Sequence, residues 1–409
     1  MNYNEALEYI HSLAVFGSIP GLERIRELLG VLDNPQDELK FIHVAGTNGK
    51  GSTCTMLSEI YKRAGLKVGL YTSPYVVDFR ERIQINGEYI PKDELARLCE
   101  RVKNTGIYVT EFEFITALAF LYYKEQNCDL VILEVGLGGR FDATNIIKKP
   151  LCSVITRIDL DHTAYLGNTY SEIAAEKCGI IKENCPVVVY PDQNDDALKT
   201  IGEYAVEYTI PHLSSVNVLS SDMSGNRFIY NGEEYSTQLV GEHQVYNTVT
   251  AIETAKRVGM ASDENIREGI AAAAIAARVE VISREPLVVL DGSHNPNGAD
   301  ALSNFMKNCD SIVAVIGMMA DKDCELFLRK IMPYCSSAVT VTVKENSRTI
   351  AAEELRNLAE KYCTDVTAAD SYESALAIAK EKSGGTAPVF VCGSLYLASA
   401  VREMLKNTF

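Results

Sequence analysis

A surplus of positive charge is missing from this sequence. Lys and Arg together number 39 and Asp and Glu number 55, so the formal net charge is −16. Proteins whose main work is non-specific binding to nucleic acid or to an anionic membrane need a basic surface, and the composition argues against both partners. Small anionic substrates stay compatible with it, because a local basic pocket can lie on an acidic molecule.

Long apolar runs and closely spaced cysteines are missing as well. No stretch approaches the roughly 18 apolar residues of a membrane span, and the first residues do not have the basic segment and apolar core of an export signal. The eleven cysteines are scattered and never form C-x-x-C, which argues against a zinc ribbon or a thioredoxin-type pair. We therefore expect reduced thiols, no membrane partner and a cytoplasmic location.

The sequence does contain a repeated alternation of apolar strands and amphipathic helices. Four strands and two helices are expected in the first part of the chain, at 41–45, 67–71, 129–135 and 152–158, and at 52–64 and 114–125. A continuous apolar strand, a polar turn and a helix in succession are typical of a parallel sheet covered on both faces. The predicted fold class is therefore α/β and doubly wound, with a mostly parallel sheet.

A second α/β rhythm begins after residue 283, with strands expected at 287–290, 311–316, 337–343 and 389–392. At about 150 residues per domain, the length corresponds to roughly two to three domains. Charge and a proline interrupt the helical pattern between Val281 and Pro286, so the boundary is placed there. The prediction is an N-terminal domain over 1–282 and a smaller C-terminal domain over 283–409.

A glycine-rich segment between the first strand and its helix carries the sharpest signal. Its residues are Gly46, Thr47, Asn48, Gly49, Lys50, Gly51 and Ser52. In this position glycines let backbone N–H groups point at phosphate oxygens, and the helix N-terminus adds its positive dipole end. The segment predicts a P-loop in which Lys50 reaches the β- and γ-phosphates of ATP. It departs from the standard pattern, because Val44 replaces the first glycine and the hydroxyl that normally ligates Mg²⁺ is displaced to Ser52.

Three side chains that suit Mg²⁺ follow the ends of other predicted strands. They are Ser73, Glu134 and His162. Because ligands of an open parallel sheet bind beyond the carboxyl ends of its strands, we expect the three beside the phosphate loop, where Mg²⁺ could bridge ATP phosphates. Each residue alone has another explanation: Ser73 can begin a turn, Glu134 can cap a glycine-rich loop, and His162 can be an ordinary loop histidine.

Further residues are candidates for contact with an anionic substrate. Arg80 and Arg82 could present positive charge, although an ordinary solvated charge run has the same pattern. Asp291 and His294 stand in the loop DGSHNPNG after a predicted strand, and its composition is that of a site loop. A serine–histidine–aspartate triad within this loop is disfavoured, because no G-x-S-x-G elbow is present. Arg278 precedes the predicted linker and could reach across a cleft between domains.

Nine segments, in order from residue 20 to residue 397, together resemble the folylpolyglutamate synthase and dihydrofolate synthase family of the Mur ligase superfamily. They are PGLERI, HVAGTNGKGS, TSPYVVDFRERI, EVGLGGRFDATN, LDHTAYLG, EKCGIIK, GEHQVYN, DGSHNPNG and CGSLYL. The displaced hydroxyl of the P-loop is the form found in this family. The resemblance implies an N-terminal P-loop ATPase domain and a smaller, Rossmann-like C-terminal domain with the active site between them.

The resemblance also implies roles for individual residues. Lys50 and its loop would hold the ATP phosphates, and Ser73, Glu134 and His162 would bind Mg²⁺, with two metal sites expected. Lys177 is similar to a family lysine that is carbamylated and helps to hold the second metal, although by its chemistry alone it could be an exposed helix lysine. The remaining implied contacts are those of Asn247, Arg278 and Asp291 with the nucleotide, of His294 with ATP and the incoming glutamate, and of Arg80, Arg82, Phe112, Asp142 and Ala143 with the folate or pterin.

The activity implied is ATP-dependent addition of L-glutamate to the carboxylate of a folate or of dihydropteroate, through an acyl phosphate, by an enzyme expected to be a monomer. Both activities are expected in one enzyme, and folylpolyglutamate synthase activity alone is the alternative. A peptidoglycan Mur ligase is disfavoured, because only 45 residues precede Gly46, too few for a domain that binds a UDP-sugar. A P-loop hydrolase or switch is the rival from another class, but it leaves the loop DGSHNPNG without a role.

Overall fold

The computed structural model describes residues 1–16, 20–76, 78–275, 279–344 and 348–409. The chain forms two compact units. The first comprises residues 1–220, 227–238 and 244–273, and the second comprises 221–226, 239–243 and 274–409. The boundary predicted between residues 282 and 283 lies inside a strand of the second unit. Within the described ranges, no helix is both long enough and apolar enough to cross a membrane.

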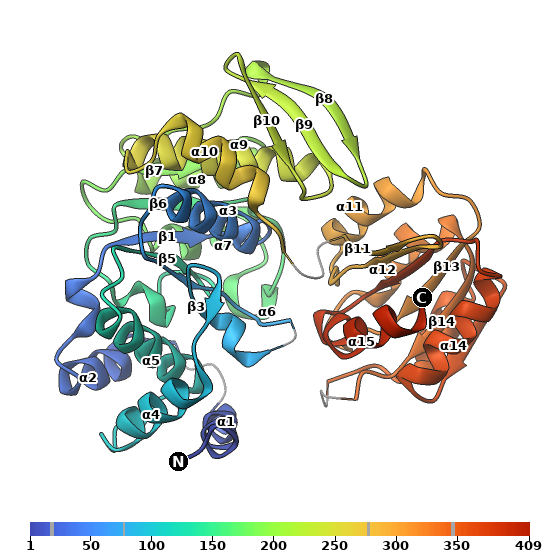
Figure 1. Ribbon diagram of the computed structural model, residues 1–409, viewed down its shortest axis with the longest axis horizontal. Helices are drawn as coiled ribbons and strands as arrows, with labels where there is room; N and C mark the ends of the chain where they lie inside the picture. Colours follow the sequence, from blue (N-terminus) through green and yellow to red (C-terminus); the bar gives the residue numbers. More distant parts are fainter. Residues whose placement is uncertain (17–19, 77, 276–278, 345–347) are drawn as a thin grey trace. The chain divides into compact units, whose positions relative to one another are not determined.

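A seven-stranded sheet forms the centre of the first unit (Figure 1). In spatial order its strands are β4 (Glu88–Tyr89), β3 (Ile83–Ile85), β2 (Val68–Tyr71), β5 (Leu130–Glu134), β1 (Phe41–Ala45), β6 (Cys152–Ile155) and β7 (Val187–Val189). The pairings from β2 to β7 are parallel, and β3 and β4 add an antiparallel edge. The mostly parallel α/β fold expected from the sequence is therefore confirmed. The carboxyl ends of β1, β2, β5 and β6 share one edge.

Helices cover both faces of this sheet because its strands are apolar on both sides. The helices of the first unit are α1 (Tyr3–Ser12), α2 (Glu23–Val31), α3 (Lys50–Arg63), α4 (Lys92–Lys103), α5 (Glu111–Glu125), α6 (Thr163–Leu166), α7 (Tyr170–Cys178), α8 (Asp195–Tyr204), α9 (Glu242–Val258) and α10 (Asp263–Ala272). Val131 and Leu133 of β5 share a buried core with α5. By strand alternation Ile132, which lies between them, faces the opposite side of the sheet. On that side α3 packs against β1, β2 and β5 (Figure 1).

A separate three-stranded sheet, in the order β10 (Glu233–Thr237), β9 (Gly225–Tyr230) and β8 (Val216–Asp222), was not predicted. Its outer strand β8 is mostly exposed and does not alternate between buried and exposed residues. A strand with no buried face lacks the two-residue period that identifies strands in a sequence.

The second unit is a six-stranded sheet with its own helices. Its strands in spatial order are β11 (Glu280–Arg284), β12 (Leu287–Leu290), β16 (Val389–Cys392), β13 (Ile312–Ile316), β14 (Cys335–Val341) and β15 (Val366–Ala369). All pairings are parallel except that of β11 with β12. The helices are α11 (Pro296–Met306), α12 (Cys324–Ile331), α13 (Ala352–Ala359), α14 (Tyr372–Ser383) and α15 (Leu395–Thr408). The expected second α/β region is therefore present.

Candidate active site

The predicted phosphate loop connects β1 to α3. Gly49 caps the helix with a φ of 86°, a left-handed conformation that favours glycine. Gly46 lies so close to Thr156, the residue that follows β6, that an added Cβ would be 1.8 Å from Thr156 Oγ1. Lys50 Nζ donates hydrogen bonds to the carbonyl oxygens of Gly46 at 3.0 Å and Thr47 at 3.2 Å. The lysine therefore folds back over the loop, as a phosphate-binding lysine would.

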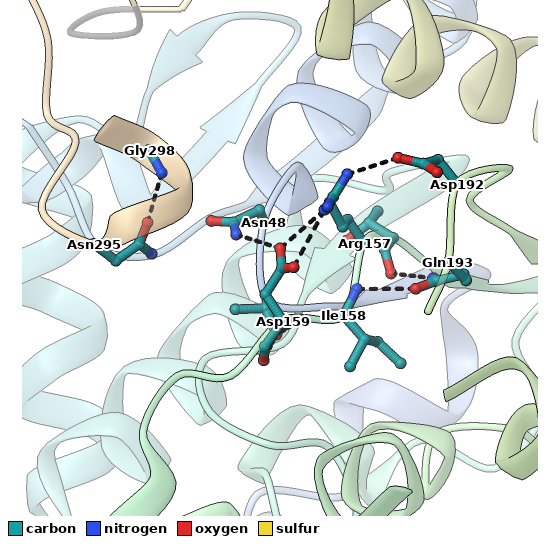
Figure 2. A network of polar contacts seen from close by, with 10 residues as sticks. Asn48, Arg157, Ile158, Asp159, Asp192, Gln193, Asn295 and Gly298 are labelled. Carbon is teal, nitrogen blue, oxygen red and sulfur yellow. Dashed lines mark hydrogen bonds and ion pairs between the residues drawn. The ribbon is translucent and has the colours of Figure 1, made fainter. Parts of the chain in front are cut away.

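A polar network that was not predicted holds the tip of this loop (Figure 2). The backbone N–H groups of Thr47 and Asn48 both donate to the Arg157 carbonyl oxygen, at 2.7 and 3.1 Å. Asn48 Nδ2 donates to Asp159 Oδ2 at 2.8 Å, and the Arg157 guanidinium pairs with the same carboxylate and with Asp192. Burial raises the pKa of Asp159, against the influence of Arg157. Arg157 and Asp159 come just after β6, at the sheet edge that also carries the phosphate loop. This position is the sequence signal that could have identified them as site residues.

Asn247 of α9 lies directly against the phosphate loop. A Cβ added to Gly49 would be 2.3 Å from Asn247 Oδ1, and the Asn247 side chain is 2% exposed. Its Nδ2 donates to Gln244 Oε1 at 3.0 Å, one turn earlier in the helix. The structure thus brings this predicted nucleotide residue to the loop, across almost 200 residues of sequence.

Lys177, near the end of α7, is buried rather than exposed. Its Nζ donates to the Gly46 carbonyl oxygen at 2.9 Å, so two lysines contact the same carbonyl group. Burial, and then the positive charge of Lys50, lower the pKa of Lys177 from 10.5 to about 7. A substantial fraction of this amine is therefore neutral at physiological pH, which makes it a nucleophile.

Two of the three predicted metal ligands lie together. The backbone N–H of Ser73 donates to Glu134 Oε2 at 3.0 Å, and the Glu134 side chain is buried. A Cβ on Gly51 would be 3.9 Å from both carboxylate oxygens, so Glu134 faces the start of α3. His162 caps α6 with a φ of 51°, and its side chain is 45% exposed. Within the described part of the chain, no cluster of three or more His, Cys, Asp or Glu side chains forms a metal site.

The loop after β5 is organised by the buried carboxylate of Asp142. Its Oδ2 accepts from the backbone N–H groups of Gly136 at 3.1 Å and Leu137 at 2.9 Å, and its Oδ1 accepts from Thr144 N at 3.0 Å. Burial raises the pKa of this carboxyl, against the effect of its hydrogen-bond donors. Ala143 is buried and begins the 3₁₀ turn η4 (Ala143–Ile146). The structure therefore shows Asp142 as the residue that shapes the loop.

The aromatic candidate lies on α5, and the two basic candidates lie on a 3₁₀ turn. Phe112 of α5 packs its ring against Tyr71, 6.0 Å between centroids, and a Cβ on Gly136 would be 2.5 Å from the Phe112 ring. Arg80, in the 3₁₀ turn η3 (Phe79–Arg82), pairs with Asp78, with Nη2 2.6 Å from Oδ2. The guanidinium of Arg82 lies over the rings of Tyr75 and Phe79, at 5.3 and 5.7 Å.

The second unit presents the loop after β12. Asp291 is buried, and its two carboxylate oxygens accept from the N–H groups of Val279 and Ser293, both at 2.8 Å. His294 Nδ1 lies 3.0 Å from the Gly292 carbonyl oxygen. Asn295 caps α11 by accepting from Gly298 N at 2.8 Å (Figure 2). Arg278, the remaining predicted nucleotide residue, lies outside the described residues.

The chain matches two known domain families in succession. The model of the Mur ligase middle domain matches residues 44–255, and that of the Mur ligase, glutamate ligase domain, matches residues 277–395. The folylpolyglutamate synthase of Lacticaseibacillus casei is 36% identical, with 99% of both chains covered. The dihydrofolate synthase/folylpolyglutamate synthase of Bacillus subtilis is 35% identical, again with 99% of both covered.

Among solved structures, the folylpolyglutamate synthase of Mycobacterium tuberculosis complexed with ADP and AMPPCP superposes with a TM-score of 0.87 at 28% identity. The alignment covers 98% of this chain and 99% of that one. The likeness in sequence and in fold thus covers 98–99% of this chain, and the two Mur ligase models match the two α/β regions in order. The chain belongs to the folylpolyglutamate synthase and dihydrofolate synthase family of the Mur ligases.

Proposed function

We propose that the protein is an ATP-dependent ligase that adds L-glutamate to the carboxylate of a folate and also of dihydropteroate. The observation that carries the proposal is the phosphate loop with Lys50 and the buried Lys177 on the same Gly46 carbonyl, in a chain of this family. Relatives named for one activity and for both are almost equally similar to this chain. Dual activity is therefore the finer part of the proposal.

The chemistry follows from the poor reactivity of a carboxylate as an acyl donor. Transfer of the γ-phosphoryl group of ATP to the substrate carboxylate gives an acyl phosphate and ADP. The amino group of L-glutamate then attacks the acyl carbon, and an amide forms as phosphate leaves. Lys50 and the N–H groups at the start of α3 stabilise the charge on the transferring group.

Magnesium fits the chemistry of the residues at this edge of the sheet. A buried carboxylate, Glu134, next to a serine and facing the start of α3 is a hard oxygen donor beside the expected position of the phosphates. Glu134, Ser73 and His162 would hold the metal. When bound, Mg²⁺ would neutralise charge on the phosphate oxygens.

A carbamate on Lys177 belongs to the same proposal. A neutral amine attacks carbon dioxide, which forms an N–C bond and releases one proton, and a pKa of about 7 leaves enough neutral amine for that reaction. The carbamate would replace a positive charge beside Lys50 with a negative one. Some roles remain predictions: contact with the nucleotide by Asn247, Arg278 and Asp291, and contact with the glutamate by His294. Action on these small substrates as a cytoplasmic monomer is also a prediction.

The deciding experiment measures phosphate release against a panel of acceptors. Dihydropteroate, tetrahydrofolate and 5,10-methylenetetrahydrofolate are each supplied with ATP, Mg²⁺ and L-glutamate, and the products are separated by mass. We expect release to require both glutamate and an acceptor, and Lys50→Ala to abolish it. ADP formation at full rate with neither would identify a hydrolase and refute the ligase. Activity on the folates without activity on dihydropteroate would refute only the dual activity.

A further inference from the structure

A histidine stands in the central strand of the first sheet, among apolar residues. His43 in β1 is 0% exposed, and its strand neighbours Ile42 and Val44 are equally buried. Its Nε2 lies 2.9 Å from Thr144 Oγ1. Its Nδ1 is buried and has no hydrogen-bond partner among the residues that the structure describes. Burial lowers the pKa of His43 to about 3, so the ring is neutral.

The hydrogen bonds continue from Thr144 to the loop after β5. Thr144 Oγ1 donates to Asp142 Oδ1 at 2.5 Å. A hydroxyl that donates to a carboxylate can accept through its lone pairs, so the proton of His43 lies on Nε2 and points at Thr144. This tautomer leaves only an acceptor, Nδ1, without a partner, whereas the other tautomer would leave a buried N–H donor unpaired. The three side chains form a directed chain that ends at Asp142.

The end of this chain determines the shape of the loop. Asp142 Oδ2 holds the N–H groups of Gly136 and Leu137. Gly136 is packed against the ring of Phe112, and a Cβ on Gly139 would be 2.8 Å from the carbonyl oxygen of Lys177. Any shift of Asp142 therefore reaches the aromatic candidate for pterin contact on one side and the backbone of α7 on the other.

We infer that His43 is a positioning residue for the acceptor substrate, acting through Thr144 and Asp142 on the loop that contains residues 136–142. The inference rests on the proposed function, because it assigns the loop to the folate or dihydropteroate. Packing alone does not account for this residue. A leucine would fill a strand that is apolar on both sides, whereas the imidazole leaves a buried nitrogen unpaired, which costs free energy.

The test compares variants that break the hydrogen bonds from His43 through Thr144 to Asp142 with variants that keep them. His43→Leu removes the donor at similar size, and His43→Gln keeps an N–H group near the position of Nε2. Thr144→Val removes the hydroxyl while it keeps the shape, and Thr144→Ser keeps the hydroxyl. Ile42→Val is the matched control, because it perturbs the same strand on the opposite face without touching the chain.

Steady-state kinetics give the first readout. We expect His43→Leu and Thr144→Val each to raise KM for the acceptor by about tenfold, with KM for ATP changed by less than about twofold. His43→Gln and Thr144→Ser should restore most of the affinity. The double variant His43→Leu/Thr144→Val should raise KM for the acceptor no more than either single variant, because both substitutions break the same series of hydrogen bonds. Equal changes in both KM values, no change in either, or the same pattern in Ile42→Val would overturn the inference.

Hydrogen exchange of the free protein gives a readout that needs no substrate. We expect the N–H groups of Gly136 and Leu137 to exchange at least about tenfold faster in His43→Leu, and unchanged in Ile42→Val. Unchanged exchange in His43→Leu and Thr144→Val would refute the positioning role, even in an active ligase. Faster exchange in a protein that ligates no folate or dihydropteroate would instead refute the proposed function and the substrate assignment, while the link to the loop stood. If His43→Leu does not fold, Thr144→Val decides by the same criteria.

Discussion

Replacing Lys177 by methionine should stabilise the protein, and the gain should fade as pH rises. The lysine is buried with its Nζ on the Gly46 carbonyl, and its pKa falls from 10.5 in the unfolded chain to about 7 in the fold. Below pH 7 both states carry the proton, and the fold bears the full penalty, about 5 kcal/mol. Between pH 7 and 10.5 the unfolded state binds the extra proton, so the wild type gains stability with rising pH.

Lys177→Met has a similar volume and no charge, so the difference in the free energy of unfolding isolates this group. From pH 7.5 to 9.5 the advantage of the variant should decline by about 2 to 3 kcal/mol. Urea unfolding at a series of pH values, followed by circular dichroism, measures it. Buffers must be purged of carbon dioxide, because a carbamate would change the charge being titrated.

Lys148→Met controls for the loss of one positive charge, because the Lys148 side chain is 73% exposed and pairs with Asp37 at the surface. Its effect should stay below about 1 kcal/mol at each pH. A difference between Lys177→Met and wild type that changes by less than about 0.5 kcal/mol over the same range would show that the amine keeps an ordinary pKa, and the reasoning from burial and from Lys50 would be wrong.

Two further predictions concern the nucleotide and the metal. Gly49→Ala should weaken ADP binding, measured by calorimetry, by at least about tenfold. The new Cβ would lie 2.3 Å from Asn247 Oδ1, and the backbone φ of 86° is unfavourable for alanine. Gly30→Ala in α2, where nothing lies within 4 Å of the new Cβ, is the control and should leave binding unchanged. Glu134→Ala and His162→Ala should each reduce turnover by about a hundredfold or more with an unchanged circular dichroism spectrum. Titration of each variant with Mg²⁺ should show weaker activation than in the wild type. Near-normal turnover in both variants would contradict their assignment to the metal site.

The parts of the fold that could be predicted are those with strong local patterns. The strands expected at 41–45, 287–290 and 389–392 match β1, β12 and β16, because each is a short apolar run that ends in a polar or glycine-rich turn. The antiparallel strands β3 and β4 are too short for such a pattern. The three-stranded sheet escaped prediction because β8 has no buried face.

The candidate site divides in the same way. Lys50 stands in a loop whose glycines and flanking strand are visible in the sequence. The buried Lys177 contacts the Gly46 carbonyl, 131 residues away in the chain. No local pattern encodes that contact, since α7 carries charged residues around it. Arg157 and Asp159 were overlooked because their partners on the phosphate loop become apparent only when β1 and β6 pair.

The attachment of the phosphate loop to Arg157 also determines which amides are left for an anion. The N–H groups of Thr47 and Asn48 donate to the Arg157 carbonyl oxygen, and the N–H group of Thr53 donates to the Gly49 carbonyl oxygen. The donors in between belong to residues 49–52, at the start of α3, where helix geometry leaves N–H groups without internal partners. Among the described residues, we therefore expect the amides of residues 49–52 to be the ones that an anion would meet. We expect a bound phosphate group to lie at the start of α3, beside the loop carbonyl groups that the ammonium group of Lys50 contacts.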